Sequence, residues 1–245
     1  MALLLNCDLG ESFGAWQMGL DHDVFPHINQ ANIACGFHAG DPLVMLNTLQ
    51  LAKQHGVMIG AHPAYPDLVG FGRRSMNCSS QEIRALMLYQ IGALDGMAQS
   101  TGQSVQYVKP HGALYNDMMA KVEVRQAIMQ AIKDYHGTLT LMLQATPQWQ
   151  QHKQEAYAHG IELCFEAFAD RGYDDAGRLL PRSHPSALHT RADMLAQVQQ
   201  LNAHGSITTV SGKTLELHAD SLCVHGDNLA GVQAIAEVKA LLTAP

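Results

Sequence analysis

The sequence predicts a (β/α) barrel of seven or eight parallel strands, formed by a single domain over residues 1–245. Short apolar runs alternate with longer segments whose apolar residues recur every three or four positions, which is the spacing of an amphipathic helix. The apolar runs are nearly continuous, as expected for parallel strands that helices cover on both faces. A doubly wound open sheet is the alternative, because strand order cannot be read from a sequence.

Eight runs of five or six mostly apolar residues are the candidate strands. Each run ends in polar or glycine-containing sequence before the next helical segment begins. In chain order the runs are 2–7, 31–35, 57–61, 105–109, 139–144, 161–165, 206–210 and 221–225.

Three long segments with helical spacing are the clearest candidate helices. Each has Asp, Ser or Asn near its start and glycine at its end, as N-caps and left-handed C-caps require. Three later segments repeat the scheme less regularly. The six segments are 41–56, 79–102, 116–137, 147–159, 190–204 and 228–243.

Composition limits the classes of protein to consider. A chain of 245 residues with 47% hydrophobic content fits one α/β domain with a large core. Its net charge of −7 and the lack of a basic run argue against nucleic acid or an anionic membrane as a partner. Five scattered cysteines without a C-x-x-C pair fit a reducing compartment. With neither a signal peptide nor about 18 uninterrupted apolar residues, the sequence predicts a cytoplasmic protein.

Polar side chains follow the predicted strands at the point where each strand ends. In parallel α/β folds these carboxyl-terminal loops share one face, so their side chains converge. One histidine at a strand end is usually structural, but four of them beside acids and a lysine favour a catalytic pocket. In chain order the residues are Asn6, Asp8 and Glu11, then His38 and Asp41, His62, Lys109, His111, Tyr115 and Asn116, and finally His225, Asp227 and Asn228.

The same segments resemble the LamB/YcsF family, in order and over residues 1–245. The segments are "LNCDLGESFG", "NIACGFHAGDP", "GAHPAYPDLVGFGRR", "VKPHGALYN", "FADRGYDDAGRLLPR" and "HGDN". The resemblance implies an irregular (β/α) barrel similar to polysaccharide deacetylases. It also implies an ATP-dependent 5-oxoprolinase that hydrolyses 5-oxo-L-proline to L-glutamate together with subunits B and C. Self-association into a homo-oligomer is compatible with this assembly.

Opening a five-membered lactam needs a polarised carbonyl oxygen and an activated water. The candidate catalytic residues are Asp8, Glu11, His38, His62 and His111. The candidate substrate-binding residues are Asn6, Arg73, Lys109, Asn116, His225 and Asp227. Lys109 would neutralise a carboxylate or phosphate, and His111 or His225 would protonate the departing nitrogen. Asp8, His38 and His62 also form a candidate site for a divalent metal, although their spacing matches no local metal motif.

Three further segments carry weaker signals. "GFGRR", with Arg73 and Arg74, is either a solvated loop or an anion-binding one. Arg171 and Tyr173 of "DRGYDD", with Arg178 and Arg182 nearby, would face a partner subunit or ATP. "SGKT" at 211–214 resembles the end of a P-loop, but that motif requires glycine where the chain has Ile207, so we predict a turn after a strand.

Two other functions agree with the same residues. A non-catalytic subunit that binds a lactam or a sugar would also place polar groups at strand ends. A metal-dependent carbohydrate deacetylase would share the histidines and acids, and tightly bound zinc would favour it. Convergence on a deep pocket with perturbed pKa values would favour an enzyme over a binding subunit.

Overall fold

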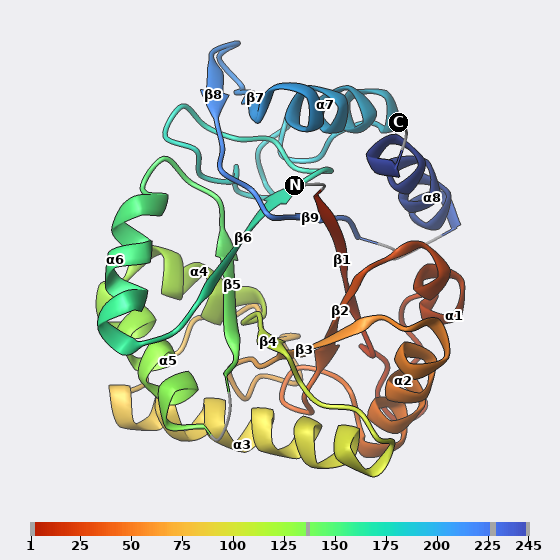
Figure 1. The fold of residues 1–245 in the computed structure, drawn as a ribbon, viewed down its shortest axis with the longest axis vertical. Helices are drawn as coiled ribbons and strands as arrows, with labels where there is room; N and C mark the ends of the chain where they lie inside the picture. Colours follow the sequence, from red (N-terminus) through yellow and green to blue (C-terminus); the bar gives the residue numbers. More distant parts are fainter. Residues whose placement is uncertain (1–2, 136–137, 226–228, 244–245) are drawn as a thin grey trace.

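Seven parallel strands close into a barrel within the described residues, and helices surround it (Figure 1). The computed structural model describes residues 3–135, 138–225 and 229–243. The barrel closes because β9 pairs with both β6 and β1, which confirms the barrel over the open sheet. In order around the barrel the strands are β1 (Leu4–Leu9), β2 (Gln30–Ala34), β3 (Met58–His62), β4 (Tyr107–Val108), β5 (Thr140–Gln144), β6 (Leu163–Phe168) and β9 (Ser221–Cys223).

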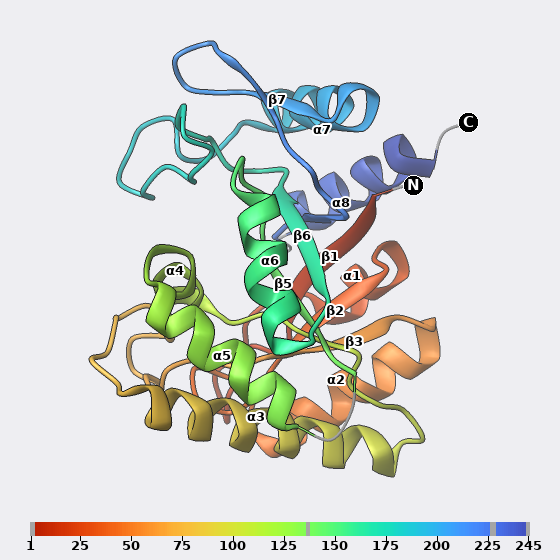
Figure 2. The same ribbon diagram turned by 60° about the vertical axis from the view of Figure 1, so that its left-hand side comes forward.

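The helices lie outside the barrel in both views of the ribbon (Figures 1 and 2). Their bounds are α1 (Asp21–Val24), the 3₁₀ helix η1 (Phe25–His27), α2 (Pro42–His55), α3 (Ser80–Ser100), α4 (Gly112–Ala120), α5 (Val122–Asp134), α6 (Trp149–His159), α7 (Arg191–His204) and α8 (Leu229–Thr243). No helix in this described part of the chain has both the length and the apolar character needed to cross a membrane.

Local sequence signals explain where several helices begin and end. The carboxylate of Asp41 accepts the first free N–H groups of α2, so this acid is a helix cap and not a site residue. Ser79 and Glu82 form a capping box at the start of α3. Gly56 ends α2 with a φ of 65°, a conformation that glycine adopts without strain.

The segment predicted as one helix over 116–137 is instead two helices. The first, α4, begins at Gly112, and extended backbone at Lys121 separates it from α5. Asn116 therefore lies inside α4 and does not cap a helix. Asp117 attaches α4 to the β3–α3 segment by accepting a hydrogen bond from the hydroxyl of Tyr65 at 3.0 Å.

The run at 206–210 is not a barrel strand, which corrects the prediction. Its ordered part, β7 (Ser206–Thr208), pairs antiparallel with β8 (Thr214–Glu216) in a separate two-stranded sheet. Thr208 and residues of β8 are exposed, as expected for a hairpin with one face in solvent. "SGKT" begins in the turn of this hairpin, where Thr209 N–H donates to Lys213 O at 2.8 Å, so the predicted turn is confirmed.

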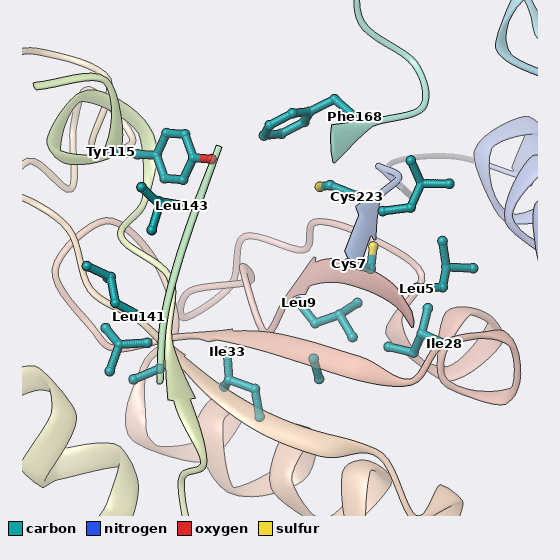
Figure 3. Close-up of a cluster of buried hydrophobic side chains, with 14 of the residues drawn as sticks. Leu5, Cys7, Leu9, Ile28, Ile33, Tyr115, Leu141, Leu143, Phe168 and Cys223 are labelled. Carbon is teal, nitrogen blue, oxygen red and sulfur yellow. The ribbon is translucent and has the colours of Figure 1, made fainter. Parts of the chain in front are cut away.

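Alternation along the barrel strands separates the apolar core from a polar interior. Leu5, Cys7 and Leu9 of β1 belong to the buried hydrophobic cluster (Figure 3). The intervening Asn6 and Asp8 bond instead to residues of other barrel strands and of the segment that follows β4. This alternation carries polar groups up the inside of the barrel to its carboxyl-terminal mouth.

Candidate active site

A cavity of about 520 Å³ lies at the carboxyl ends of the barrel strands, the edge where (β/α) barrels hold their sites. Its walls come from β1, β3 and β6 and from the segments after β1, β3, β4, β6 and β9. Of the eleven candidate catalytic and substrate-binding residues, eight line this cavity: Asp8, Glu11, His62, Arg73, Lys109, His111, Asn116 and His225.

The other three of these eleven candidates do not line the cavity or lie outside the described residues. Asn6 and His38 are fully buried beside it. Asp227 lies outside the described residues. We therefore expect neither Asn6 nor His38 to contact a substrate directly.

Lys109 is buried between two carboxylates. Its Nζ lies 3.0 Å from Asp8 Oδ1 and 3.0 Å from Glu166 Oε2, and it also donates to Asn6 Oδ1 at 3.2 Å. Burial alone would lower the pKa of Lys109, but the negative charges around it, Asp8 first, hold that pKa well above its ordinary value. Burial would raise the pKa of Asp8, but His62 and Lys109 hold it well below its ordinary value.

The predicted use of Lys109 as an anion binder does not fit these contacts. An ammonium group has three N–H donors, and Asp8, Glu166 and Asn6 accept from it. Asn6 is itself oriented by donating to Ser221 Oγ at 2.8 Å. Lys109 therefore neutralises and positions the Asp8 carboxylate.

Sequence reasoning missed Glu166 in this arrangement. The residue is fully buried on β6 and supplies the second negative charge beside Lys109. A charged residue within the apolar run "LCFEAF" was the available signal, because an unpaired carboxylate is costly in a core.

Three histidines and a glutamate form a compact cluster beside the ion pair. The rings of His38 and His111 stack with centroids 3.8 Å apart and 3° between their planes. Glu11 Oε1 lies 3.2 Å from His38 Nε2 and 3.6 Å from His111 Nδ1. One ligand atom from each of Glu11, His38, His62 and His111 lies within 4.8 Å of all the others.

Burial shifts the pKa values of His38, His111 and Glu11 in the direction that favours their neutral forms. It lowers the pKa of His38 and of His111 well below the ordinary value, and neighbouring histidines lower both further. Burial and the charge of Asp8 raise the pKa of Glu11.

Two nitrogens of the cluster face each other without an obvious proton between them. His62 Nδ1 donates to Lys109 O at 2.7 Å, and His111 Nε2 donates to Phe71 O at 2.9 Å, since a carbonyl oxygen can only accept. The remaining nitrogens, His62 Nε2 and His111 Nδ1, are 2.9 Å apart. Neutral rings would aim lone pairs at each other, so the contact requires a shared proton or a bound cation.

The donor set fits a divalent cation. Neutral imidazoles and a carboxylate are ordinary ligands of zinc and similar metals, and His38 Nδ1 is buried without a hydrogen-bond partner among the described residues. The geometry changes the predicted ligand set of Asp8, His38 and His62. Glu11 and His111 join the two other histidines, whereas Asp8 Oδ1 is bonded to Lys109 and Asp8 Oδ2 lies 3.4 Å from His62 Nε2.

The segment after β3 holds the histidines in place. Phe71 has a φ of 54°, which is uncommon for a residue other than glycine, and its carbonyl fixes His111. Gly72 follows with a φ of 63°, and a Cβ there would lie 2.8 Å from His111 Cδ2 and 2.9 Å from His38 Cβ. Asp67 bonds to the backbone N–H of Arg74 and to its guanidinium, so that arginine is structural.

A second acid–histidine pair lies across the cavity mouth. His225 Nδ1 is 2.8 Å from Asp170 Oδ2, and His225 lines the cavity. Burial would lower the pKa of His225, but the Asp170 carboxylate outweighs it and raises that pKa above its ordinary value. Asp170 lies within the quoted segment "FADRGYDDAGRLLPR", yet only the fold reveals its pairing.

A closed parallel barrel with a polar, charged cavity at its carboxyl-terminal mouth has the architecture of a (β/α)-barrel enzyme. The chain belongs to the LamB/YcsF family, whose model matches residues 3–245. The 5-oxoprolinase A subunit of Pseudomonas fluorescens strain Pf0-1 is 52% identical over 241 residues, covering 98% of this chain and 96% of the relative. That of Vibrio cholerae serotype O1 strain O395 is 49% identical over 239 residues, covering 97% and 96%.

Two solved structures share the fold. The lactam utilization protein of Thermus thermophilus is 39% identical, with a TM-score of 0.91 over 99% of this chain and 96% of its own. A putative cellobiose-phosphate cleavage protein of Enterococcus faecalis V583 is 12% identical, with a TM-score of 0.55 over 98% and 90%. The second likeness concerns the fold alone.

Proposed function

We propose that this chain is the A subunit of an ATP-dependent 5-oxoprolinase, a hydrolase that opens the cyclic amide of 5-oxo-L-proline to L-glutamate. Its similarity to named A subunits supports the substrate. The observation that carries the chemistry is the convergence of three groups at one cavity: the Lys109–Asp8 ion pair, the Glu11–histidine cluster and the His225–Asp170 pair.

Asp8 is the proposed base for the attacking water. The sequence offers Asp8, Glu11, His38 and His62 as candidates for this base. His38 does not line the cavity, and Glu11 and His62 belong to the candidate metal cluster. Asp8 faces the cavity, and its low pKa keeps it ionised at neutral pH. The ion pair with Lys109 holds this carboxylate in position.

His225 is the proposed donor of a proton to the departing nitrogen. Sequence left His111 and His225 as alternatives for this step. His111 Nε2 is occupied by Phe71 O, and burial disfavours its charged form. The Asp170 carboxylate favours the protonated form of His225 at the cavity wall, which is the form that a general acid needs.

We further propose that Glu11, His38, His62 and His111 hold a divalent cation. When bound, the cation would supply a Lewis acid that polarises the lactam carbonyl. The bonds from His62 and His111 to backbone carbonyls fix the ring orientations, as partners behind metal-binding histidines commonly do.

We assign the use of ATP to the complex with subunits B and C. The chain lacks a complete P-loop, since Ile207 stands at the required glycine and β7–β8 occupies the segment. We expect negligible glutamate release from 5-oxoproline by this chain alone, with or without ATP. Adding the B and C subunits should restore ATP-dependent release, and an Asp8→Asn chain should not. Full ATP-driven turnover by the chain alone would contradict the assignment.

A metal-dependent carbohydrate deacetylase is the second candidate, favoured by the four-ligand cluster. Assaying the metal-loaded chain alone for acetate release from N-acetylated sugar oligomers separates the two functions. A non-catalytic binding subunit would leave glutamate release by the complex unchanged in the Asp8→Asn variant. The cytoplasmic location and self-association stay predictions.

A further inference from the structure

The arginines of this chain fall into two groups. The five arginines that do not line the cavity each pair with a carboxylate: Arg74, Arg84, Arg125, Arg178 and Arg191. Arg73, Arg171 and Arg182 line the cavity, and none of the three has a carboxylate partner within the described part of the chain. In a chain of net charge −7, three arginines without a described carboxylate partner that all line one cavity suggest that the anion comes from a ligand.

Arg171 is held rigidly at this place. The residue is buried, and its Nε donates to Ala187 O at 3.1 Å while Nη2 donates to Leu180 O at 2.6 Å. No bond from Nη1 to another described residue accompanies them. Burial and then the nearby charge of Arg182 lower the pKa of Arg171, so an anion between the two guanidinium groups would relieve their repulsion.

Arg73 approaches the cavity from a different segment. Its guanidinium carbon lies 4.9 Å from the centroid of the Phe71 ring, whose carbonyl fixes His111. A cation placed over an aromatic face keeps its N–H edge free for an acceptor. Arg73 thus links the arginine group to the proposed reacting centre.

We propose that Arg73, Arg171 and Arg182 form an oxyanion-binding subsite that holds a carboxylate or phosphoryl group of the ligand. This inference rests on the proposed function, because it divides the cavity into a reacting end and a recognition end. The planar guanidinium forms paired hydrogen bonds to either oxyanion. Lys109, with its donors engaged by Asp8, Glu166 and Asn6, leaves that recognition to the arginines.

Binding to the full-length chain, measured by calorimetry, tests the subsite. The probes are 5-oxoproline, 2-pyrrolidinone, which has the same lactam ring without a carboxylate, and inorganic phosphate. The variants are Arg182→Gln and Arg73→Gln, because both side chains are exposed and form no ion pair with another described residue. The matched control is Arg178→Gln, in the same β6–α7 segment as Arg182 and paired with Asp174.

Each variant should weaken binding of the anionic probe at least ~10-fold, and the control should leave it unchanged. If 5-oxoproline then binds no better than 2-pyrrolidinone, the subsite holds the substrate carboxylate. If only phosphate binding is lost, the subsite holds a phosphoryl group. Wild-type affinity for both anions in both variants would overturn the subsite, as would no anion binding by the wild type. Arginine-dependent phosphate binding without any lactam binding would keep the subsite and count against the proposed function.

Discussion

The contact between His62 Nε2 and His111 Nδ1 is the strongest constraint at the scale of single residues. In each ring the other nitrogen donates its proton to a backbone carbonyl. While both rings are neutral, neither can therefore donate a hydrogen bond to the other. Single histidines at strand ends could be named from sequence. The sequence does not predict that their lone pairs face each other, because the backbone carbonyls that accept from the two rings belong to segments distant in the chain.

We expect the purified chain to bind about one divalent cation, and His62→Asn and His111→Asn to lose most of it. Elemental analysis after dialysis measures the metal. The control is His152→Asn, which alters a buried histidine of α6 outside the cluster and should leave the metal content unchanged. Equal metal content in all of these proteins, or none in a wild type loaded with zinc, manganese or iron, would contradict the cluster assignment.

The histidine cluster leaves no room for a side chain at Gly72. In Gly72→Ala, strain from the positive φ adds to collision with His38 and His111, and we expect a loss of ~2–4 kcal/mol in the free energy of unfolding. Gly56→Ala has a similar φ of +65° and nothing within 4 Å, so it should lose only ~1 kcal/mol. Urea unfolding measures both. A loss of equal size in the two variants would show that His38 and His111 move to accommodate the added methyl group at little cost in stability.

At the scale of elements, the helices around the barrel are joined by specific polar contacts as well as by the core. Arg125 of α5 forms two bonds to Glu155 of α6, with Nε 2.6 Å from Oε2 and Nη2 3.1 Å from Oε1. Its Nη1 donates to Met118 O of α4 at 2.8 Å. One buried guanidinium thus joins three consecutive helices.

Arg125→Ala should lower the free energy of unfolding by ~3–5 kcal/mol, because it strands a partly buried carboxylate and a buried carbonyl. Arg178→Ala removes an exposed pair with Asp174 and should cost less than ~1 kcal/mol. Denaturant unfolding of the two variants gives the comparison. Similar small losses would mean that the Arg125 pair contributes no more than a surface ion pair.

At the scale of the whole molecule, closure of the barrel brings the first and last strands together. β9 lies between β6 and β1, so groups separated by most of the chain meet at the cavity. The His225–Asp170 pair joins the segments that follow β9 and β6. The stabilisation that this ion pair provides should therefore depend on closure of the barrel.

Because the folded pKa of His225 is raised, its stabilising effect is complete below its ordinary value of about 6.5 and is lost as pH rises through the folded pKa. Asp170 has a lowered pKa, so it stays ionised across this range. Asp8 and Lys109 also act on His225, in opposite directions. We expect Asp170→Asn to destabilise the chain more at pH 6 than at pH 9 in urea unfolding. The same loss at both pH values would exclude an ion pair.

The sequence by itself determined the alternation of strands and helices, the caps at Asp41 and Ser79, and the set of polar residues that reach one edge of the barrel. Those features depend on local periodicity and capping, which neighbouring residues decide. It did not distinguish the hairpin at β7–β8 from a barrel strand, because a short apolar run does not indicate which strand it pairs with.

Tertiary structure alone decided which polar residues act together. It joined Glu166 of β6 to Lys109 of the segment after β4, and set Glu11 and His111 in place of Asp8 in the candidate metal cluster. It also separated Arg73, which faces the cavity, from Arg74, which pairs with Asp67. Ion pairing and ligand geometry depend on distances of a few ångströms between segments far apart in the chain, and barrel closure sets those distances.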